Sequence, residues 1–181
     1  MALSEVDKVI RYSSLFLLLL LALDSDLRRQ RIPNSLNVFF MAFGLFLGTI
    51  TAGWGGLLAS LQGLIFPIVL LYLLFTLGVL GAGDIKLCSA IGALMGGDFV
   101  LSTLLYIWGW AGIWALFYLL CRQDYKERVL FLFNYLQSCC LSCSILPYTD
   151  FSREQKKASF PFTLAVFCGT VSKIAIACVS K

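Results

Sequence analysis

The chain has 181 residues, of which 60% are hydrophobic and 13% are charged, and its formal net charge is +4. Several apolar runs approach the roughly 20 residues that an α-helix needs to cross a bilayer. This composition excludes an ordinary soluble protein and leaves no room for a separate soluble domain. We therefore expect an all-α fold, a polytopic transmembrane bundle of about six spans that forms one domain over residues 1–181.

The first apolar run covers residues 9–23. Lys8 and Arg11 precede it, as in a secretory signal peptide, but no small-residue cleavage site follows it. The run leads instead through Asp24-Ser25-Asp26 to arginines at positions 28, 29 and 31. Because Lys and Arg concentrate on the cytoplasmic side of membrane proteins, we expect this run to enter from outside and to end inside.

Five further runs are expected to cross the membrane, at residues 35–52, 56–80, 84–97, 100–121 and 160–179. Pro33 begins the second helix, because Pro is tolerated at a first turn, and Asn34 or Ser35 can cap its free N–H groups. The predicted external turns, 51–55 and 96–99, contain no Lys or Arg. That asymmetry supports the same orientation.

Residues 129–147 are apolar enough to form a seventh span. The basic residues that follow them would then lie outside, against the charge rule. Polar residues recur every four positions in this segment, at Asn134, Ser138 and Ser142, as on the polar face of a helix at a membrane surface. We expect a cytoplasmic interfacial helix here, and a seventh span is the alternative.

The chain contains no His, which removes the commonest general base and the commonest metal ligand. Hydrolases whose Ser or Cys nucleophile depends on a His base are thereby excluded, although a Ser–Lys arrangement is not. Among seven cysteines, Cys140 and Cys143 form a single Cys-x-x-Cys pair, which supports neither a disulfide framework nor a zinc site. We expect no metal and no cofactor.

Two aspartates lie at the predicted cytoplasmic ends of apolar runs: Asp26 after the first run and Asp84 in Gly-Ala-Gly-Asp-Ile-Lys. An Asp at a helix centre in a bilayer costs roughly 2.5 to 3.5 kcal/mol, so such a pair requires a reason. Two aspartates about 3 Å apart share one proton and can hydrolyse a peptide, one activating water while the protonated partner polarises the carbonyl. Packing of the first and fourth spans can bring these two together.

The residues around Asp84 suit such a pair. Gly81 and Gly83 lack side chains, so the backbone before Asp84 can adopt unusual angles and a substrate strand can approach closely. Gly-x-Gly-Asp alone is a weak motif, since glycines in membrane helices usually serve close packing. Lys86 either anchors the helix at the interface or influences Asp84 through its charge.

Other charged residues have plainer interpretations. Asp24 is the alternative to Asp26, but two positions apart on a helix the side chains point about 200° apart, so only one of them can face Asp84. Asp98 follows two glycines in a predicted external turn, where Asp is common. The three arginines at positions 28, 29 and 31 are expected to set the topology and to contact anionic lipids.

Asp26 is followed by Ile32-Pro33-Asn34, and Gly81-Ala82-Gly83-Asp84-Ile85-Lys86-Leu87 comes later. With this spacing and span order, the chain resembles the aspartic prepilin peptidase family, membrane enzymes that process type IV pilins and related subunits. Phe160-Pro161-Phe162 and Gly169 resemble the family's last helix. The resemblance implies catalysis by Asp26 and Asp84 without a metal, and cleavage of a short basic leader just before the hydrophobic helix of a prepilin or pseudopilin.

Larger members of that family also methylate the new amino terminus and carry paired Cys-x-x-Cys motifs before the first span. Few residues precede the first run here, so the chain resembles the short, protease-only members associated with Flp or Tad pili, with archaeal preflagellin-type peptidases as a related possibility. No separate methyltransferase domain is expected. The resemblance implies a multi-pass protein of the cytoplasmic membrane with its active site facing the cytoplasm, lipid contacts, and no nucleic-acid partner; the oligomeric state stays open.

Two rival functions remain open. Membrane proteases of the presenilin and signal-peptide-peptidase kind share Gly-x-Gly-Asp, but their Tyr-Asp partner and Pro-Ala-Leu element are missing from this sequence. A proton-coupled transporter also pairs intramembrane carboxylates. Such a transporter would show acids at a midplane cavity and often repeated halves, and no repeat is visible here.

Overall fold

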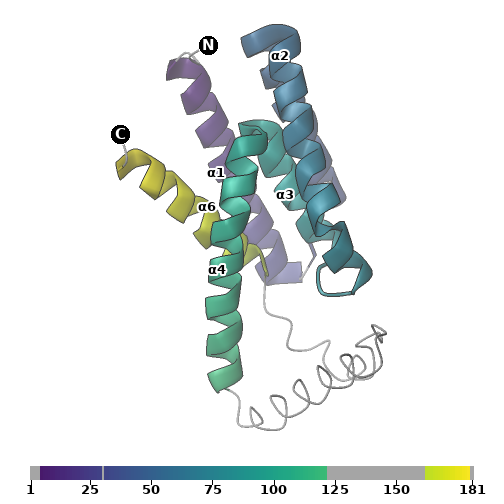
Figure 1. The fold of residues 1–181 in the computed structure, drawn as a ribbon, viewed down its shortest axis with the longest axis vertical. Helices are drawn as coiled ribbons and strands as arrows, with labels where there is room; N and C mark the ends of the chain where they lie inside the picture. The colour runs from purple at the N-terminus through teal and green to yellow at the C-terminus, as the bar shows by residue number, and fades with distance from the viewer. Residues whose placement is uncertain (1–4, 30, 122–161, 180–181) are drawn as a thin grey trace.

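The computed structural model describes residues 5–29, 31–121 and 162–179, and this part of the chain is all-α, as predicted (Figure 1). Its helices are α1 (Glu5–Arg29), α2 (Asn34–Thr76), α3 (Ala82–Met95), α4 (Gly97–Cys121) and α6 (Phe162–Val179). The interfacial helix predicted at 129–147, with its seventh-span alternative, and the Cys140/Cys143 pair lie outside the described residues.

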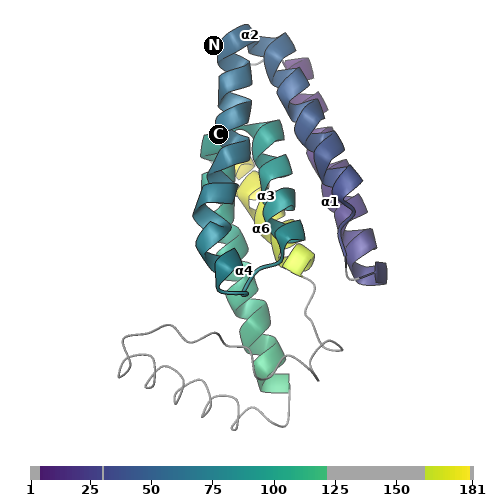
Figure 2. The same cartoon turned by 90° about the vertical axis from the view of Figure 1, so that its right-hand side faces the viewer.

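Helix α2 turns back on itself near its middle, so that it forms two arms (Figure 2). The backbone leaves helical geometry at Ala52 (φ −137°, ψ 19°) and Gly53 (φ 58°, ψ −137°), and a positive φ of this kind favours glycine. The break falls between the predicted runs 35–52 and 56–80. The described helical segments therefore follow the six predicted apolar runs in order.

The second arm of α2 ends at Thr76, four residues before the end of the predicted run 56–80. The N–H groups of Gly78 and Val79 turn back to the carbonyls of Phe75 and Leu74, at 3.0 Å each, and Gly78 has a φ of 71°. A glycine in this conformation commonly ends a helix. The predicted extension of this helix to residue 80 is therefore wrong. Hydropathy extended the run because the side chains stay apolar after the backbone has turned.

The other helix limits differ from the predicted runs mainly where polar residues flank the apolar core. Helix α1 extends well beyond the predicted 9–23 at both ends, while α3, α4 and α6 begin or end within three residues of prediction. Hydropathy marks the apolar part of a helix, whereas backbone hydrogen bonding continues into its polar ends. The extension of α1 places Asp26 in its last turns rather than after the helix.

Helix α3 is enclosed by the rest of the bundle, and every residue from Leu87 to Leu94 is buried. Glycines from both arms of α2 touch its backbone. A Cβ atom on Gly44 would lie 2.6 Å from the carbonyl oxygen of Ala93, and one on Gly63 would lie 2.1 Å from that of Gly92. Because no side chain separates these backbones, α3 is wedged between the two arms.

Polar contacts attach α1 to helices α2 and α3. Arg11 is only 8% exposed, and its guanidinium donates to the carbonyl oxygen of Leu94 at 2.5 Å and to Thr51 Oγ1 at 3.0 Å. Leu94 lies in the last turn of α3, where carbonyl groups lack partners within the helix. Arg11 therefore joins α1 to the end of α3 and to the first arm of α2.

Helix α6 packs against α4. A Cβ atom on Gly169 would lie 2.7 Å from the backbone nitrogen of Ile107, so the two helices approach closely there. Trp110 Nε1 donates to Ser172 Oγ at 2.9 Å. These two contacts fix the position of α6 relative to α4, and with it the position of the first turn of α6.

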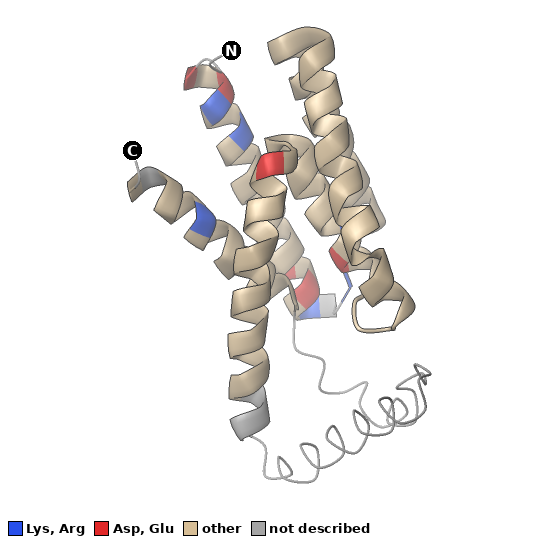
Figure 3. Ribbon diagram, viewed as in Figure 1, with Lys and Arg blue, Asp and Glu red and all other residues tan. Residues whose placement is uncertain are grey.

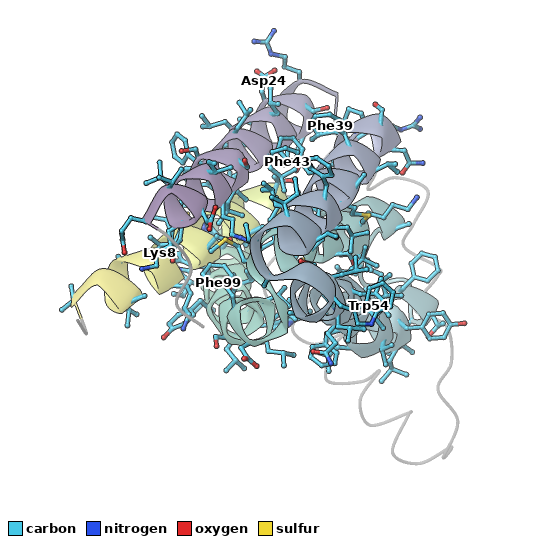
Figure 4. All side chains as sticks on the ribbon, turned by 90° about the horizontal axis from the view of Figure 1, so that it is seen from above. Lys8, Asp24, Phe39, Phe43, Trp54 and Phe99 are labelled. Atoms are coloured by element: carbon cyan, nitrogen blue, oxygen red, sulfur yellow. The ribbon has the colours of Figure 1, made fainter. Side chains whose placement is uncertain are left out.

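Two described helices are long and apolar enough to cross a bilayer, α2 and the Gly97–Phe117 part of α4, and α6 contains a shorter apolar stretch, Phe162–Ala177. Large apolar side chains cover the outer surface; Trp54, for example, is 75% exposed and lies at the edge of the bundle in Figure 4. Apolar surface of this extent is typical of contact with lipid or a partner. Together these features indicate a membrane protein.

The close contact between α2 and α3 predicts the effect of adding one methyl group. A Cβ atom on Gly92 would lie 1.9 Å from the carbonyl oxygen of Gly63, so Gly92→Ala must separate the helices, at a cost of about 1 to 3 kcal/mol. We expect a lower midpoint of thermal unfolding for the detergent-solubilised protein, followed with a thiol-reactive dye whose signal rises as buried cysteines such as Cys88 become exposed.

The matched control is Gly112→Ala on α4, where a Cβ atom would meet nothing within 4 Å. That change should leave the midpoint unchanged or raise it, since Ala is favoured over Gly in a helix by up to about 1 kcal/mol. Equal destabilisation by both substitutions would contradict the wedged arrangement of α3.

Candidate active site

A cavity of about 630 Å³ lies where the carboxyl end of α1, the segment before α2, and the first turns of α3 and α6 meet. Its lining includes six of the seven predicted site residues, with Pro33 the exception: Asp26, Asn34, Gly81, Gly83, Asp84 and Lys86. Arg31, Ala82 and three apolar residues, Ile32, Val79 and Phe162, complete it. The structure thus brings both aspartates to one cavity from helices far apart in the sequence.

The two carboxylates line this cavity from different helices. Asp26 comes from the last turns of α1 and Asp84 from the first turn of α3. In Figure 3 acidic residues mark the lower end of α1 and the nearby start of α3, while α2 has no charged residue along its length. The structure therefore brings these two helix ends together, and their matching depth in a membrane stays a prediction.

Asp26 also contacts α6. The hydroxyl of Thr163 donates a hydrogen bond to Asp26 Oδ2, and the Thr163 side chain is fully buried. Sequence reasoning missed this residue, because nothing local to Thr163 indicates that the start of α6 lies beside the end of α1, 137 positions away. The available signal was its place directly after the Phe-Pro-Phe segment.

Asp84 is held by the turn that begins α3. Its backbone N–H donates to the carbonyl of Gly81 at 3.1 Å, and its carboxyl group is hydrogen-bonded to the backbone of Gly81. Gly81 is the N-cap residue, so Asp84 occupies the third helical position. An acidic side chain there commonly reaches back to the N-cap backbone.

The two glycines of the Gly-Ala-Gly-Asp segment do not have unusual backbone angles. Gly81 has φ −78° and ψ 149°, which any residue adopts, and Gly83 lies within α3; neither has a positive φ. That part of the prediction is wrong. The structure instead explains the glycine at position 81 by limited space, since a Cβ atom there would lie 3.2 Å from Asp84 Oδ2. A Cβ atom on Gly83 would lie 3.8 Å from Ile32, which is an ordinary contact.

Two asparagines connect the start of α2 to the start of α3. Asn34 Oδ1 accepts a hydrogen bond from Lys86 Nζ at 2.8 Å. Asn37, which is fully buried and which sequence reasoning missed, donates through Nδ2 to the carbonyl oxygen of Gly83 at 3.4 Å. The first turn of α3 is therefore bonded to α2 on either side of Asp84.

These contacts correct the predicted cap of α2. Pro33 was predicted to begin the helix, but the helix begins one residue later, at Asn34; Pro33 is the N-cap residue, and no side chain caps the helix. Asn34 does not act as the cap, because it is already inside the helix and its side-chain oxygen accepts from Lys86.

Asp24 lies on the other side of α1 from Asp26. Figure 4 shows it pointing away from the bundle, and it forms an exposed ion pair with Arg28, with 2.6 Å between Arg28 Nε and Asp24 Oδ1. It does not line the cavity. The opposed directions of Asp24 and Asp26 agree with their spacing on a helix.

Nothing in the described ranges gathers three or more His, Cys, Asp or Glu side chains in a way that could hold a metal ion. What the cavity offers instead is a pair of carboxylates, two cationic side chains from Arg31 and Lys86, and an apolar wall. Paired carboxylates that share a proton can act together as general acid and general base.

Comparison with known proteins gives one family. Residues 13–120 match the model of the type IV leader peptidase family. Neither the curated proteins nor the solved structures gave a match. The matched segment contains Asp26 and Asp84 and ends before α6, so that Phe162 and Thr163 lie beyond it.

Proposed function

The chain belongs to the type IV leader peptidase family, and from that premise we propose that it is an aspartic endopeptidase with Asp26 and Asp84 as its catalytic pair. One observation carries the proposal: both carboxylates line the same cavity, although 58 positions separate them (84 minus 26). Membership in a peptidase family favours proteolysis over proton-coupled transport as the use of this pair.

The reaction needs one proton shared between the two carboxyl groups. The ionised carboxylate accepts a proton from water as the water oxygen bonds to the scissile carbonyl carbon, and the protonated partner gives its proton to the carbonyl oxygen. The tetrahedral intermediate then collapses: the carboxyl group that took the proton from water gives it to the leaving nitrogen as the carbon–nitrogen bond breaks, and the other carboxylate takes a proton from a hydroxyl of the intermediate as the carbonyl re-forms. At the end of the reaction one carboxyl group is again protonated and the other is again ionised.

The proposed substrates are type IV prepilins or pseudopilins of the Flp/Tad kind, with a basic leader and a hydrophobic helix. The cavity, about 630 Å³, lies within the roughly 300–1,000 Å³ usual for ligand sites. Its apolar wall of Ile32, Val79 and Phe162 suits the first hydrophobic residues after the cut, whereas Arg31 and Lys86 would repel a basic leader. The leader is therefore expected to leave the cavity away from these cations.

The proposed topology has six membrane segments, α1, the two arms of α2, α3, α4 and α6, in a single membrane-embedded domain over residues 1–181. The aspartates share one end of the bundle with Arg28, Arg31 and Lys86. The charge rule assigns that end to the cytoplasm. There a substrate helix can stay in lipid while water reaches the peptide bond, so we place the active site at the cytoplasmic face of the cytoplasmic membrane.

The catalytic pair is tested by co-expressing a panel of type IV and Flp-type prepilins with wild type, Asp26→Asn, Asp84→Asn and Asp24→Asn, and by sequencing the new amino terminus. We expect the first two variants to lose leader removal by on the order of 10³-fold or more. Asp24→Asn is the matched control, because that side chain points away from the cavity and pairs with Arg28. Cleavage that survives both key substitutions would overturn the mechanism.

The short distance from Gly81 to Asp84 generates a second prediction. Gly81→Ala places a methyl group 3.2 Å from Asp84 Oδ2 and so displaces the carboxylate, and we expect the cleavage rate to fall roughly 10- to 100-fold. Gly83→Ala is the control, since its Cβ atom meets only an ordinary contact, and its rate should stay within about threefold of wild type. A larger loss at Gly83 would show that substrate clearance, rather than the position of Asp84, requires this glycine pair.

A further inference from the structure

Asp26 receives a hydrogen bond from a helix that is remote in sequence and lies outside the family match. The donor is the buried hydroxyl of Thr163, in the first turn of α6, and the acceptor is Asp26 Oδ2. We propose that Thr163 is a positioning residue for the reaction, which holds the Asp26 carboxylate in the orientation that hydrolysis requires. This inference rests on the proposed catalytic role of Asp26.

The position of Thr163 in its helix makes its hydroxyl available. Two other fully buried threonines, Thr103 on α4 and Thr170 on α6, donate to the carbonyl four residues earlier in their own helices, at 2.7 Å each. That is the usual bond of a threonine inside a helix. Thr163 is the second residue of α6, so its helix has no carbonyl four positions before it, and the hydroxyl bonds to Asp26 instead.

Fixing one oxygen of the carboxylate determines where the other one lies. Asp26 lines the cavity near the end of α1, and with Oδ2 bonded to Thr163 its Oδ1 remains to exchange a proton with water or with the scissile carbonyl. Rotation of the carboxylate would separate it from the reacting atoms. Losses of about 10²-fold follow misplacements of roughly 1 Å in catalytic groups.

The rest of α6 is anchored independently of this hydrogen bond. Gly169 touches the backbone of Ile107, and Trp110 Nε1 donates to Ser172 Oγ. Both contacts lie further along α6 and involve α4 rather than α1. Removing the Thr163 hydroxyl is therefore expected to free the carboxylate of Asp26 without detaching the helix.

The test compares substitutions that separate the hydroxyl from the shape of the side chain. Thr163→Val keeps the shape and removes the oxygen, whereas Thr163→Ser keeps the oxygen and removes a methyl group. With purified enzyme in detergent and a purified prepilin, we expect the Val variant to lose roughly 10- to 100-fold in kcat, with KM within about threefold, and the Ser variant to keep kcat within about threefold of wild type.

Thr170→Val is the matched control, since it removes an equally buried hydroxyl from the same helix, one that donates to the carbonyl of Val166 in that helix. It should leave kcat within about threefold of wild type. A packing role for Thr163 predicts the reverse order, with the Val variant active and the Ser variant impaired, and that order would overturn the inference.

Two further measurements keep the outcome decisive. If Thr163→Val fails to accumulate in the membrane, Thr163→Ser is compared with Thr163→Ala, which differ only in the oxygen, and equal kcat values would overturn the inference. Wild type and Asp26→Asn are assayed alongside. Cleavage by Asp26→Asn would contradict the proposed function itself. An inactive Asp26→Asn together with a fully active Thr163→Val would contradict only the proposed role of Thr163.

Discussion

The direct backbone contact of α3 with both arms of α2 is the constraint on which the site depends. Gly44 and Gly63 bring the two arms against the backbone of α3 near Ala93 and Gly92. A helix held by backbone atoms on two sides cannot slide or rotate without steric overlap. Because Asp84 lies in the first turn of the same helix, this contact sets the depth of one carboxylate. The bonds from Asn37 to Gly83 and between the side chains of Lys86 and Asn34 then fix that first turn locally.

The other carboxylate depends on polar contacts in addition to packing, since Leu15, Leu18 and Leu19 of α1 are also buried in the core. Helix α1 is bonded toward its amino end by Arg11, which reaches the last turn of α3 and the bend of α2, and toward its carboxyl end by Asp26, which accepts from Thr163. Buried hydrogen bonds that involve a charged group contribute roughly 1.5 to 3 kcal/mol each. The two halves of the proposed catalytic pair therefore differ in their contacts: direct backbone packing of α3 places Asp84, whereas side-chain packing and long-range polar bonds place Asp26.

This difference explains which features could be predicted from the sequence. The helices follow from apolar runs, a local property, and the common end of Asp26 and Asp84 follows from the order of those runs. The end of α2 at Thr76 was not predictable from hydropathy, since Leu77, Val79 and Leu80 stay apolar after the backbone has turned. Sequence reasoning missed the contacts of Arg11, Asn37 and Thr163 for another reason. Their partners lie 83, 46 and 137 positions away, and no motif or run of the sequence marks these residues as partners.

The division of the site between matched and unmatched parts of the chain follows from the same contacts. The family match over residues 13–120 contains both aspartates and the glycines that place α3. Helix α6 lies beyond it, yet it supplies Phe162 to the cavity and Thr163 to Asp26. It is held against α4 through Gly169 and Ser172, and it also contacts α1 through the rings of Phe16 and Phe167. A chain of residues 13–120 alone would therefore keep both carboxylates but lose the donor that orients one of them.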